Sequence, residues 1–437
     1  MSNIVHGTFV LTDACNLACT YCFVKQRPVN MTEETAKRGV DFLIQNAIAT
    51  NSKKIGITFF GGEPTLRLDL MNFIFDYSKS QSNLYNLAPP DYSLITNGML
   101  FNEELESFLL KWKAYTKMIN VQLSLDGPPD IETSQRISKT NVDSGVIMEE
   151  NLAKIYNFCY KNNINVGQEV FVHSVITRKT LPRLFDIYKY FCEHKFPGLW
   201  YQLMNDEDWR PEDVDIYKEQ LELIYNYYRD NDLMEYMVGN KSFDSDVKCY
   251  NCHSAKACEA GNKACAIDPN GGIHICHRFY CDSPELQLGD LYKDPIIYNT
   301  SVKEYYESIV IADMIGEKPC KDCEDSNCRK CIAVNEAYNK VPTLCFPKYC
   351  MMIHAERDFK LKLARHLNAM FNKSKIGESK LIALRNYITF IERSLNRLAG
   401  EVENRFNSIE SKQDDMLALL LANYMKEEKM VDENLDI

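Results

Sequence analysis

The sequence predicts an α/β protein that begins with a partial (β/α)6 TIM-type barrel over residues 1–240. Three observations support this fold class. Between residues 4 and 200, short β-rich runs alternate six times with helical patterns, as in βα units on a parallel sheet. Most of the 17 cysteines then cluster between residues 249 and 350, which predicts a cysteine-rich domain over 241–355. Residues 356–437 are helical in pattern and lack cysteine, which predicts a helical extension.

The barrel elements follow from local β-propensity and from apolar residues at helical spacing. A helical pattern occupies residues 32–49, and similar patterns separate the later strands. The predicted strands are 7–11, 55–60, 93–96, 120–125, 165–175 and 199–203. Because parallel strands of such a barrel end at the same edge, we expect motifs that follow these strands to meet there.

Composition excludes several classes of protein. Of the 437 residues, 45% are hydrophobic and 25% are charged, which is typical of soluble globular chains. No apolar run approaches the length of a bilayer span, and the first residues lack the pattern of an export signal, so we expect a cytoplasmic protein. The net charge of −11 disfavours broad binding to nucleic-acid phosphates.

Three cysteines, Cys15, Cys19 and Cys22, follow the first predicted strand with CxxxCxxC spacing. Three thiolates on one short loop can hold three corners of a 4Fe-4S cluster. The fourth iron would then be open to the amino and carboxylate groups of a small molecule. Considered alone, the spacing leaves a zinc site or three unrelated thiols as alternatives.

The cysteine motif, with an aromatic residue before its last cysteine, resembles the defining motif of the radical S-adenosylmethionine (SAM) superfamily. The segment 61–64, Gly-Gly-Glu-Pro, is similar to the part of that superfamily that holds the methionine amino group, where glycine permits close backbone approach. The segments 96–98 and 123–127 also end strands, as in that superfamily. The resemblance implies that Ser124 and Arg136 contact the ribose or carboxylate. The cofactor-binding residues implied are Tyr21, Gly61, Gly62, Glu63, Pro64, Thr96, Asn97, Ser124, Asp126 and Arg136.

The same resemblance implies the chemistry. The cluster would reduce the sulfonium of SAM by one electron, releasing a 5'-deoxyadenosyl radical that abstracts a substrate hydrogen. An electron donor such as ferredoxin or flavodoxin would be needed.

The second group of cysteines can be interpreted in two ways. By spacing alone, the pairs Cys320 with Cys323 and Cys328 with Cys331 would close a zinc site of four thiolates. However, a hairpin turning at 270–272, the segments 276–279 and 288–291, and the closing residues 349–350 resemble the SPASM extension of radical SAM enzymes. That resemblance implies two auxiliary 4Fe-4S clusters, hence three in all. The implied ligands are Cys258, Cys265, Cys276 and Cys331 for the first cluster, and Cys320, Cys323, Cys328 and Cys350 for the second.

Some of these ligands have competitors. Both gaps between Cys323 and Cys331 are one residue shorter than usual in the family. Other ligand sets therefore stay open, with Cys345 in place of Cys350, and Cys249 or Cys252 in place of Cys258 or Cys265. Cys159 and Cys192 lie in helical patterns and are expected to be structural thiols.

The order of motifs is similar to that of anaerobic sulfatase-maturing enzymes and of radical maturases of ribosomal peptides. His277 stands where the sulfatase maturases carry an aspartate proposed as the general base, and Phe23 follows Cys22 where they carry tyrosine. His277 is therefore either a catalytic base or a histidine that lies at the surface or behind the residues that contact the ligand. We expect peptide or protein modification, by a thioether or carbon-carbon cross-link or by epimerisation. The alternatives are a formylglycine maturase and a metal-stabilised binding module without radical activity.

The carboxyl-terminal segment carries apolar residues at alternating three- and four-residue steps, interrupted by Arg405 and Lys412. Packing on the same chain and self-association or partner binding are equally compatible with it. Recognition of a leader peptide would come from these helices or from a separate protein. The stripe consists of Leu381, Leu384, Ile388, Ile391, Leu395, Leu398, Val402, Ile409 and Met416.

Overall fold

The computed structural model describes residues 3–140, 142–196, 199–231, 260–311, 331–340, 347–356 and 359. The chain divides into one unit, Met1–Lys380, and a remainder, Leu381–Ile437, that lies wholly outside the described residues. The predicted apolar stripe of the carboxyl-terminal segment therefore also lies outside them.

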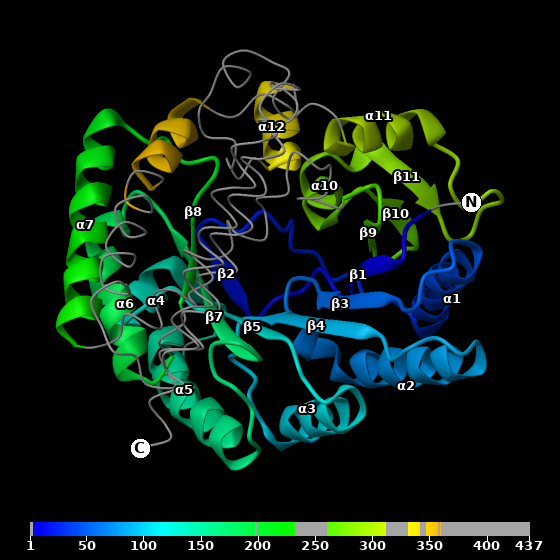
Figure 1. The fold of residues 1–437 in the computed structure, drawn as a ribbon, viewed down its shortest axis with the longest axis horizontal. Coiled ribbons are helices and arrows are strands. Elements are labelled where there is room, and N and C mark those ends of the chain that lie inside the picture. The colour runs from blue at the N-terminus through cyan, green and yellow to red at the C-terminus, as the bar shows by residue number, and fades with distance from the viewer. Residues whose placement is uncertain are drawn as a thin grey trace, which may run out of the picture. The chain divides into compact units, whose positions relative to one another are not determined.

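The first unit is built on a sheet in which six parallel strands lie side by side in chain order (Figure 1). This confirms the α/β class with a mainly parallel sheet. The strands are β1 (His6–Val10), β3 (Gly56–Phe60), β4 (Asp91–Thr96), β5 (Val121–Ser124), β7 (Val170–Ile176) and β8 (Trp200–Leu203).

Most strand bounds agree with the predictions to within two residues, but β7 begins five residues later than expected. The preceding residues form a turn, in which Asn163 and Gly167 have positive φ angles of 51° and 97°. The Glu169 carboxylate accepts a hydrogen bond from the Asn165 backbone at 3.0 Å and so holds this turn. Local turn chemistry thus overrides β-propensity there.

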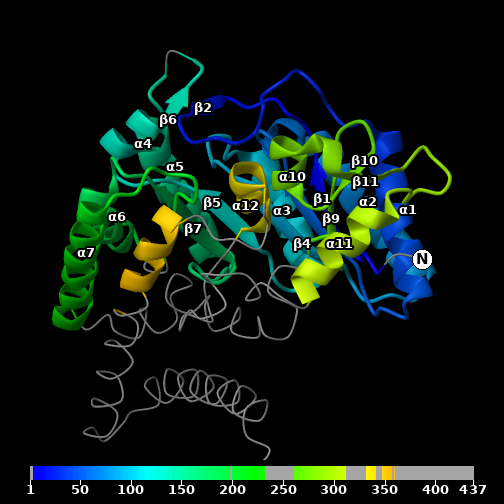
Figure 2. The same ribbon diagram turned by 90° about the horizontal axis from the view of Figure 1, so that it is seen from above.

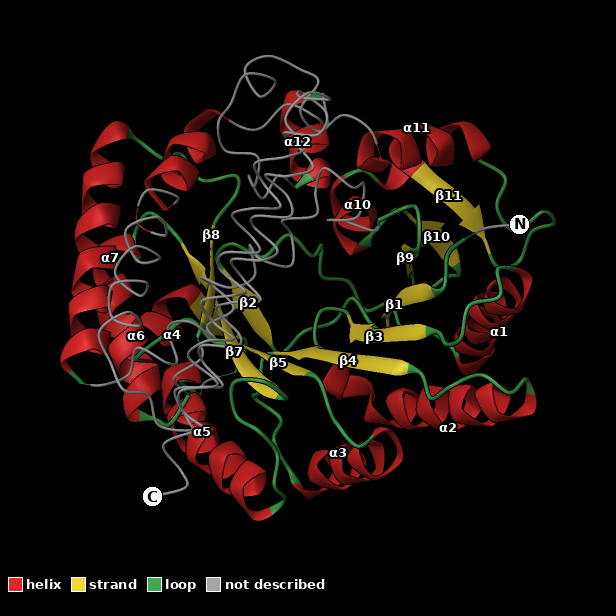
Figure 3. Ribbon diagram, viewed as in Figure 1, coloured by secondary structure: helices red, strands yellow, loops and turns green. Residues whose placement is uncertain are grey.

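Helices separate successive strands and lie outside them (Figure 3). Helix α1 begins where the sequence predicts, because the Thr32 side chain caps it by accepting a hydrogen bond from the Thr35 backbone. Among the described residues, none of the helices combines the length and apolar character needed to cross a membrane. The main helices are α1 (Glu33–Ala49), α2 (Leu68–Leu84), α3 (Glu103–Thr116), α5 (Ser144–Lys161), α6 (Leu184–Glu193) and α7 (Pro211–Asp230).

A two-stranded antiparallel sheet, which the sequence did not predict, lies beside the first cysteine motif. It pairs β2 (Leu17–Cys19) with β6 (Arg136–Ser138), and Cys19 faces Arg136 in the register. Helix α4 (Pro129–Gln135) leads directly into β6. The pairing fixes the cysteine loop to the segment after β5.

The cysteine-rich region continues the same sheet (Figure 2). Strand β9 (Ala264–Ile267) runs parallel to β1, with His6 opposite Ala264, and the chain turns back at Gly271 as predicted. The nine-stranded sheet is completed by β10 (Gly272–His274) and β11 (Gln287–Asp290). Helix α10 (His277–Asp282) lies between β10 and β11 in the chain, and helices α11 (Thr300–Ile311) and α12 (Ile332–Asn339) follow β11. The boundary predicted near residue 240 lies outside the described residues.

Candidate active site

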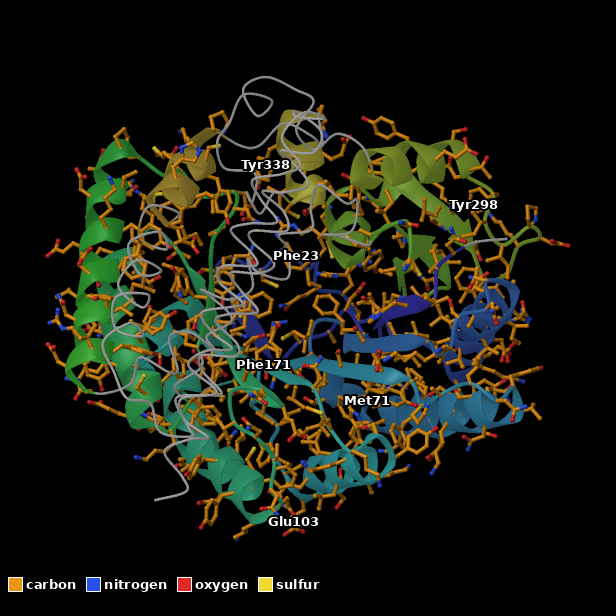
Figure 4. The ribbon with its side chains drawn as sticks, in the orientation of Figure 1. Phe23, Met71, Glu103, Phe171, Tyr298 and Tyr338 are labelled. Carbon is orange, nitrogen blue, oxygen red and sulfur yellow. The ribbon has the colours of Figure 1, made fainter. Side chains whose placement is uncertain are left out.

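A cavity of about 430 Å³ lies along the carboxyl ends of the parallel strands. Its walls combine residues of the first cysteine motif with residues from β3, β4, β5, β7 and β8, and from the start of α10. Phe23, which lines it, is labelled in Figure 4. The predicted site residues that line it are Cys15, Cys19, Cys22, Tyr21, Gly61, Gly62, Glu63, Thr96, Asn97, Ser124, Arg136 and His277.

The three cysteines of the first motif all reach this cavity from one loop. Burial raises the pKa of Cys15, and it raises the pKa of Cys19 to about 12. Both groups are therefore neutral thiols at pH 7 unless a cation compensates their charge. Clustered thiols that need a positive partner to ionise fit the requirements of an iron-sulfur cluster.

The glycines of the segment 61–64 are required by backbone packing against that loop. A Cβ atom on Gly61 would lie 2.3 Å from the Thr12 carbonyl oxygen, and one on Gly62 would lie 2.3 Å from the Ala14 carbonyl oxygen. Gly62 and Glu63 donate backbone hydrogen bonds to these two carbonyls, at 2.7 and 2.9 Å. The sequence predicted close backbone approach here, and the structure identifies the cysteine loop itself as one partner.

Glu63 is almost fully buried, and its carboxylate accepts four hydrogen bonds. Oε1 accepts from the Thr65 backbone and hydroxyl and from the Thr96 hydroxyl, at 3.0, 2.6 and 2.7 Å. Oε2 accepts from the Asn97 backbone at 2.7 Å. Burial raises the pKa of this carboxyl, while these donors oppose the rise. Glu63 thus holds the ends of β3 and β4 together at the cavity wall.

Asn97 connects the end of β4 to the cysteine loop. Its Nδ2 atom donates to Asn16 Oδ1 at 2.7 Å and approaches Cys15 Sγ at 3.7 Å. Its Oδ1 atom accepts from the Met99 backbone at 2.9 Å, which fixes the orientation of the amide. The predicted residue Pro64 is buried at the start of a short 3-10 helix, Pro64–Arg67, and does not line the cavity.

Tyr21 is held by a buried charged network behind the cavity wall. Its hydroxyl donates to Asp126 Oδ2 at 2.5 Å and accepts from Arg136 Nη1 at 2.5 Å. Arg136 also forms an ion pair with Glu132 at 3.2 Å. Burial raises the pKa of Asp126, and it raises the pKa of Glu132 to about 8. Asp126 does not line the cavity, and it influences the cavity only by holding the Tyr21 hydroxyl.

Apart from Ser124, the part of the cavity wall formed by β5, β7, β8 and the residues after β8 was not predicted from the sequence. It carries uncharged polar side chains from β5, β7 and β8 and the residues that follow. The alternation of buried and partly exposed residues in these strands is the signal that could have identified them, because one face of each strand bears the polar groups. These residues are Gln122, His173, Trp200, Gln202 and Asn205.

His277 is the first residue of α10 and packs between aromatic rings. Its ring centroid lies 4.7 Å from that of Phe60 and 5.9 Å from that of Phe23. Burial and the neighbouring Arg278 charge lower the pKa of His277 to about 4, so the imidazole is neutral and weakly basic. Its role as a general base stays a prediction, and this environment favours a packing role.

Arg278 joins the cysteine loop to the cysteine-rich region, a contact that was not predicted. Its guanidinium lies 4.4 Å from the centroid of the Phe23 ring and forms ion pairs with Asp206, at 3.2 Å, and with Asp282. Asp206 follows β8 and also accepts a hydrogen bond from Tyr338 of α12 at 2.7 Å. One carboxylate thus links the end of β8 to both α10 and α12.

Three of the four cysteines predicted for the first auxiliary cluster are described. Cys276 and Cys331 are the residues that cap α10 and α12, two helices in contact, while Cys265 lies buried in β9, which also contacts α10. Burial raises the pKa of Cys265 to about 12 and also raises that of Cys331. The grouping of these three cysteines stays a prediction, and its fourth member, Cys258, lies outside the described residues.

The remaining predicted ligands are mostly outside the described residues, so their grouping stays a prediction. Within the part of the chain that the structure describes, no three His, Cys, Asp or Glu side chains converge as they would on a single metal ion. Cys350 is described and partly buried. The undescribed cysteines are Cys249, Cys252, Cys258, Cys320, Cys323, Cys328 and Cys345.

Two other cysteines were expected to be structural. Cys159 is fully buried in α5, and Cys192 in α6 lies 3.4 Å from the Tyr228 hydroxyl. Neither lines the cavity, which agrees with the expectation. Cys281, which the sequence did not single out, is buried in a small apolar cluster with Val10 and Phe60.

Residues 9–149 match the radical SAM superfamily. The chain is 25% identical over 292 residues to the radical SAM cyclopropyl synthase TigE of Paramaledivibacter caminithermalis, covering 61% of this chain and 56% of that relative. It is 24% identical over 345 residues to a cysteine-type anaerobic sulfatase-maturating enzyme of Clostridium perfringens, covering 73% and 87%.

Among solved structures, that of anSMEcpe with bound AdoMet is similar, with a TM-score of 0.65 and 21% identity. The match covers 88% of this chain and 99% of the solved one. At that identity the likeness establishes the fold.

Proposed function

We propose, for a chain whose residues 9–149 form a radical SAM domain, that it modifies a side chain or backbone carbon of a peptide or protein by hydrogen abstraction. The products would be a thioether or carbon-carbon cross-link or an epimerised residue. The observation that carries the proposal is the shared cavity, where the three motif cysteines meet residues 61–63, Ser124 and Arg136.

The first step of the proposal concerns the cofactors. Cys15, Cys19 and Cys22 would hold one 4Fe-4S cluster, and the raised pKa values of Cys15 and Cys19 suit ligands that ionise only on metal binding. SAM bound to such a cluster supplies a 5'-deoxyadenosyl radical when an electron is delivered. Two auxiliary clusters in a SPASM domain, behind a partial barrel, complete the proposed architecture.

The protein groups around the first cysteine loop would position the cofactor. Glu63 and Asn97 fix the ends of β3 and β4 against the cysteine loop, so the cofactor wall is organised before any ligand binds. The Tyr21 hydroxyl is held by Asp126 and Arg136, which positions its ring at the cavity. A rigid wall of this kind would orient SAM relative to a substrate on the opposite wall.

The charges along the cavity favour a peptide over a phosphorylated substrate. Among the described residues that line it, the arginines are Arg136 and Arg278, and each is already paired with carboxylates. A nucleoside triphosphate would bring several negative charges without a free cation to receive them. A polypeptide segment instead offers neutral amide groups, which match the uncharged polar wall.

A second candidate is formylglycine formation on a sulfatase, as suggested by the sequence similarity to the Clostridium perfringens maturating enzyme. His277 replaces the aspartate expected for that reaction, and its lowered pKa makes it a poor base near neutral pH. We therefore place this candidate second. A metal-stabilised binding module without radical activity is the third, and metal analysis would distinguish it.

The decisive experiment uses anaerobically reconstituted protein with SAM and dithionite, and measures 5'-deoxyadenosine by mass spectrometry. We expect turnover in the wild type and in Cys159→Ala, whose thiol is buried away from the cavity, and none in Cys19→Ala. Iron analysis should give about twelve irons per chain for three four-iron clusters. Zinc alone, or wild-type protein that leaves SAM intact, would contradict the proposal.

The substrate class is tested separately. Candidate peptides are incubated with the active enzyme, and a cross-link is detected as the loss of two hydrogens in mass. Epimerisation is detected as uptake of deuterium from heavy water. A formyl product on a sulfatase peptide with the target cysteine would instead establish the second candidate.

A further inference from the structure

Two glutamines on the uncharged wall have cavity-facing amide groups without a hydrogen-bond partner among the described residues. Gln122 lies on β5 and Gln202 lies on β8, and both line the cavity. Both residues are only partly buried, so their side-chain amides are accessible to a molecule bound in the cavity.

The register of the strands places these amides on either side of β7. Strand β5 pairs with β7, where Ser124 lies opposite His173, and β7 pairs with β8, where Val175 lies opposite Gln202. His173 and Val175 of β7, both lining the cavity, thus lie between the two glutamines. The Trp200 ring packs against His173 at a centroid distance of 4.6 Å and gives this wall a flat apolar area.

A primary amide presents both donors and an acceptor, which is the complement of a peptide unit. Two such amides beside an aromatic ring suit an extended main chain that carries no charge of its own. Two further polar atoms nearby, Trp200 Nε1 and Asn205 Oδ1, also lack a partner among the described residues. Native proteins rarely leave such atoms unpaired, so a polar ligand at this wall would give them the partners that they lack.

We propose that Gln122 and Gln202 bind main-chain amide groups of the polypeptide substrate and so position it along the wall formed by β5, β7 and β8. This inference rests on the proposed function and adds to it the part of the cavity and the chemical groups that recognise the substrate. Recognition of the main chain would leave the choice of side chain to other contacts.

The test uses the reconstituted holoenzyme and a pool of pentapeptides with cysteine at the centre, acetylated and amidated at their ends. Equilibrium dialysis with SAM present identifies the tightest binder and gives its Kd. We expect Gln122→Leu and Gln202→Leu each to weaken this binding by about five- to tenfold, the loss of one hydrogen bond, and to leave the Kd for SAM unchanged. Gln45→Leu, a change at an exposed position on α1, is the matched control.

A second arm tests the main chain directly. In the tightest peptide, each amide in turn is replaced by an ester, which removes one N–H donor. If a glutamine accepts a hydrogen bond from one peptide N–H, the ester at that position should weaken binding to the wild type. The same ester should have little effect on binding to the variant that lacks this glutamine, as in a double-mutant cycle.

Several results would overturn the inference. They are the absence of any bound peptide in the pool, unchanged peptide binding in the double glutamine variant, and equal weakening of SAM and peptide, which would assign the amides to the cofactor. If the wild type fails to cleave SAM, the proposed function itself is wrong. If it cleaves SAM and the peptide result is negative, only this assignment is lost.

Discussion

The Tyr21 hydroxyl donates a 2.5 Å hydrogen bond to Asp126, a residue 105 positions later in the chain that is fully buried. This contact joins the first cysteine loop to the end of β5. Because Arg136 donates to the same hydroxyl, the tyrosine oxygen is shared by a carboxylate and a guanidinium.

Replacing Tyr21 by Phe should therefore lower stability by about 1–3 kcal/mol, since it removes one hydrogen bond from each of two buried charged groups, Asp126 and Arg136. It should also weaken SAM binding, because the ring loses its anchor. Urea unfolding and equilibrium dialysis measure the two effects. Tyr160→Phe, at a position that is 76% exposed, is the control and should change neither. Unaltered stability of Tyr21→Phe would mean that the network does not hold the loop.

Gly62→Ala should prevent stable assembly of the first cluster. The added methyl would lie 2.3 Å from the Ala14 carbonyl oxygen, so the segment before Cys15 has to move. The expected result is a loss of about four irons per chain, measured by iron analysis after anaerobic reconstitution. Gly7→Ala on β1 is the control, because its new methyl would meet only the ends of the Leu43 and Phe9 side chains. Full iron content in Gly62→Ala would contradict this account.

The buried Glu132 should make stability fall as pH rises. Its pKa is raised by burial from 4.5 to about 8, so between these values the folded chain binds a proton that the unfolded chain releases. The melting temperature should thus decrease between about pH 5 and pH 8, and this decrease should be smaller in Glu132→Gln. Scanning calorimetry across that range measures it. Glu150→Gln, at an exposed position on α5, should keep the wild-type slope.

Asp206→Asn should loosen the cysteine-rich region from the end of β8. The change removes the charge that pairs with Arg278, in a largely buried setting, and we expect a loss of about 2 kcal/mol. Asp208→Asn, two residues later, breaks only exposed pairs, with Lys348 and Arg210, and should cost less than about 1 kcal/mol. Denaturant unfolding of both variants decides the matter. An equal loss of unfolding free energy in the two variants would show that the buried Asp206 contacts contribute no more than an exposed ion pair.

Each of Cys265→Ala, Cys276→Ala and Cys331→Ala should lower the iron content by about four per chain if the first auxiliary cluster has the predicted ligands. Cys281→Ala is a demanding control, because Cys281 is buried only five residues beyond Cys276 yet is not a predicted ligand. Iron retained in all three ligand variants would overturn the assignment.

Much of the sheet could be predicted because its signals are local. The strands β1, β3 and β4 are short β-rich runs followed at once by recognisable motifs, and Thr32 marks the start of α1. Since parallel strands share an edge, the meeting of Cys15, Glu63 and Asn97 also followed from their positions after strands.

The remaining features depend on contacts that no local pattern records. Strands β2 and β6 have three residues each, too few to show a period, and they exist because Cys19 meets Arg136 across the fold. Arg278 looks like any surface arginine until Phe23 and Asp206 are placed beside it. The polar faces of β5 and β8 carry a weak alternation signal, but four residues per strand are too few to tell a cavity wall from a solvent face.

The parallel pairing of β1 with β9 has a consequence for biosynthesis. During translation, β1 can acquire β3 as a neighbour early, but its other edge stays open until the segment around Ala264 has left the ribosome. An exposed strand edge is a template for wrong pairing, so the nascent chain passes through a period in which it is prone to aggregate. A fragment that ends before β9 would retain that hazard permanently.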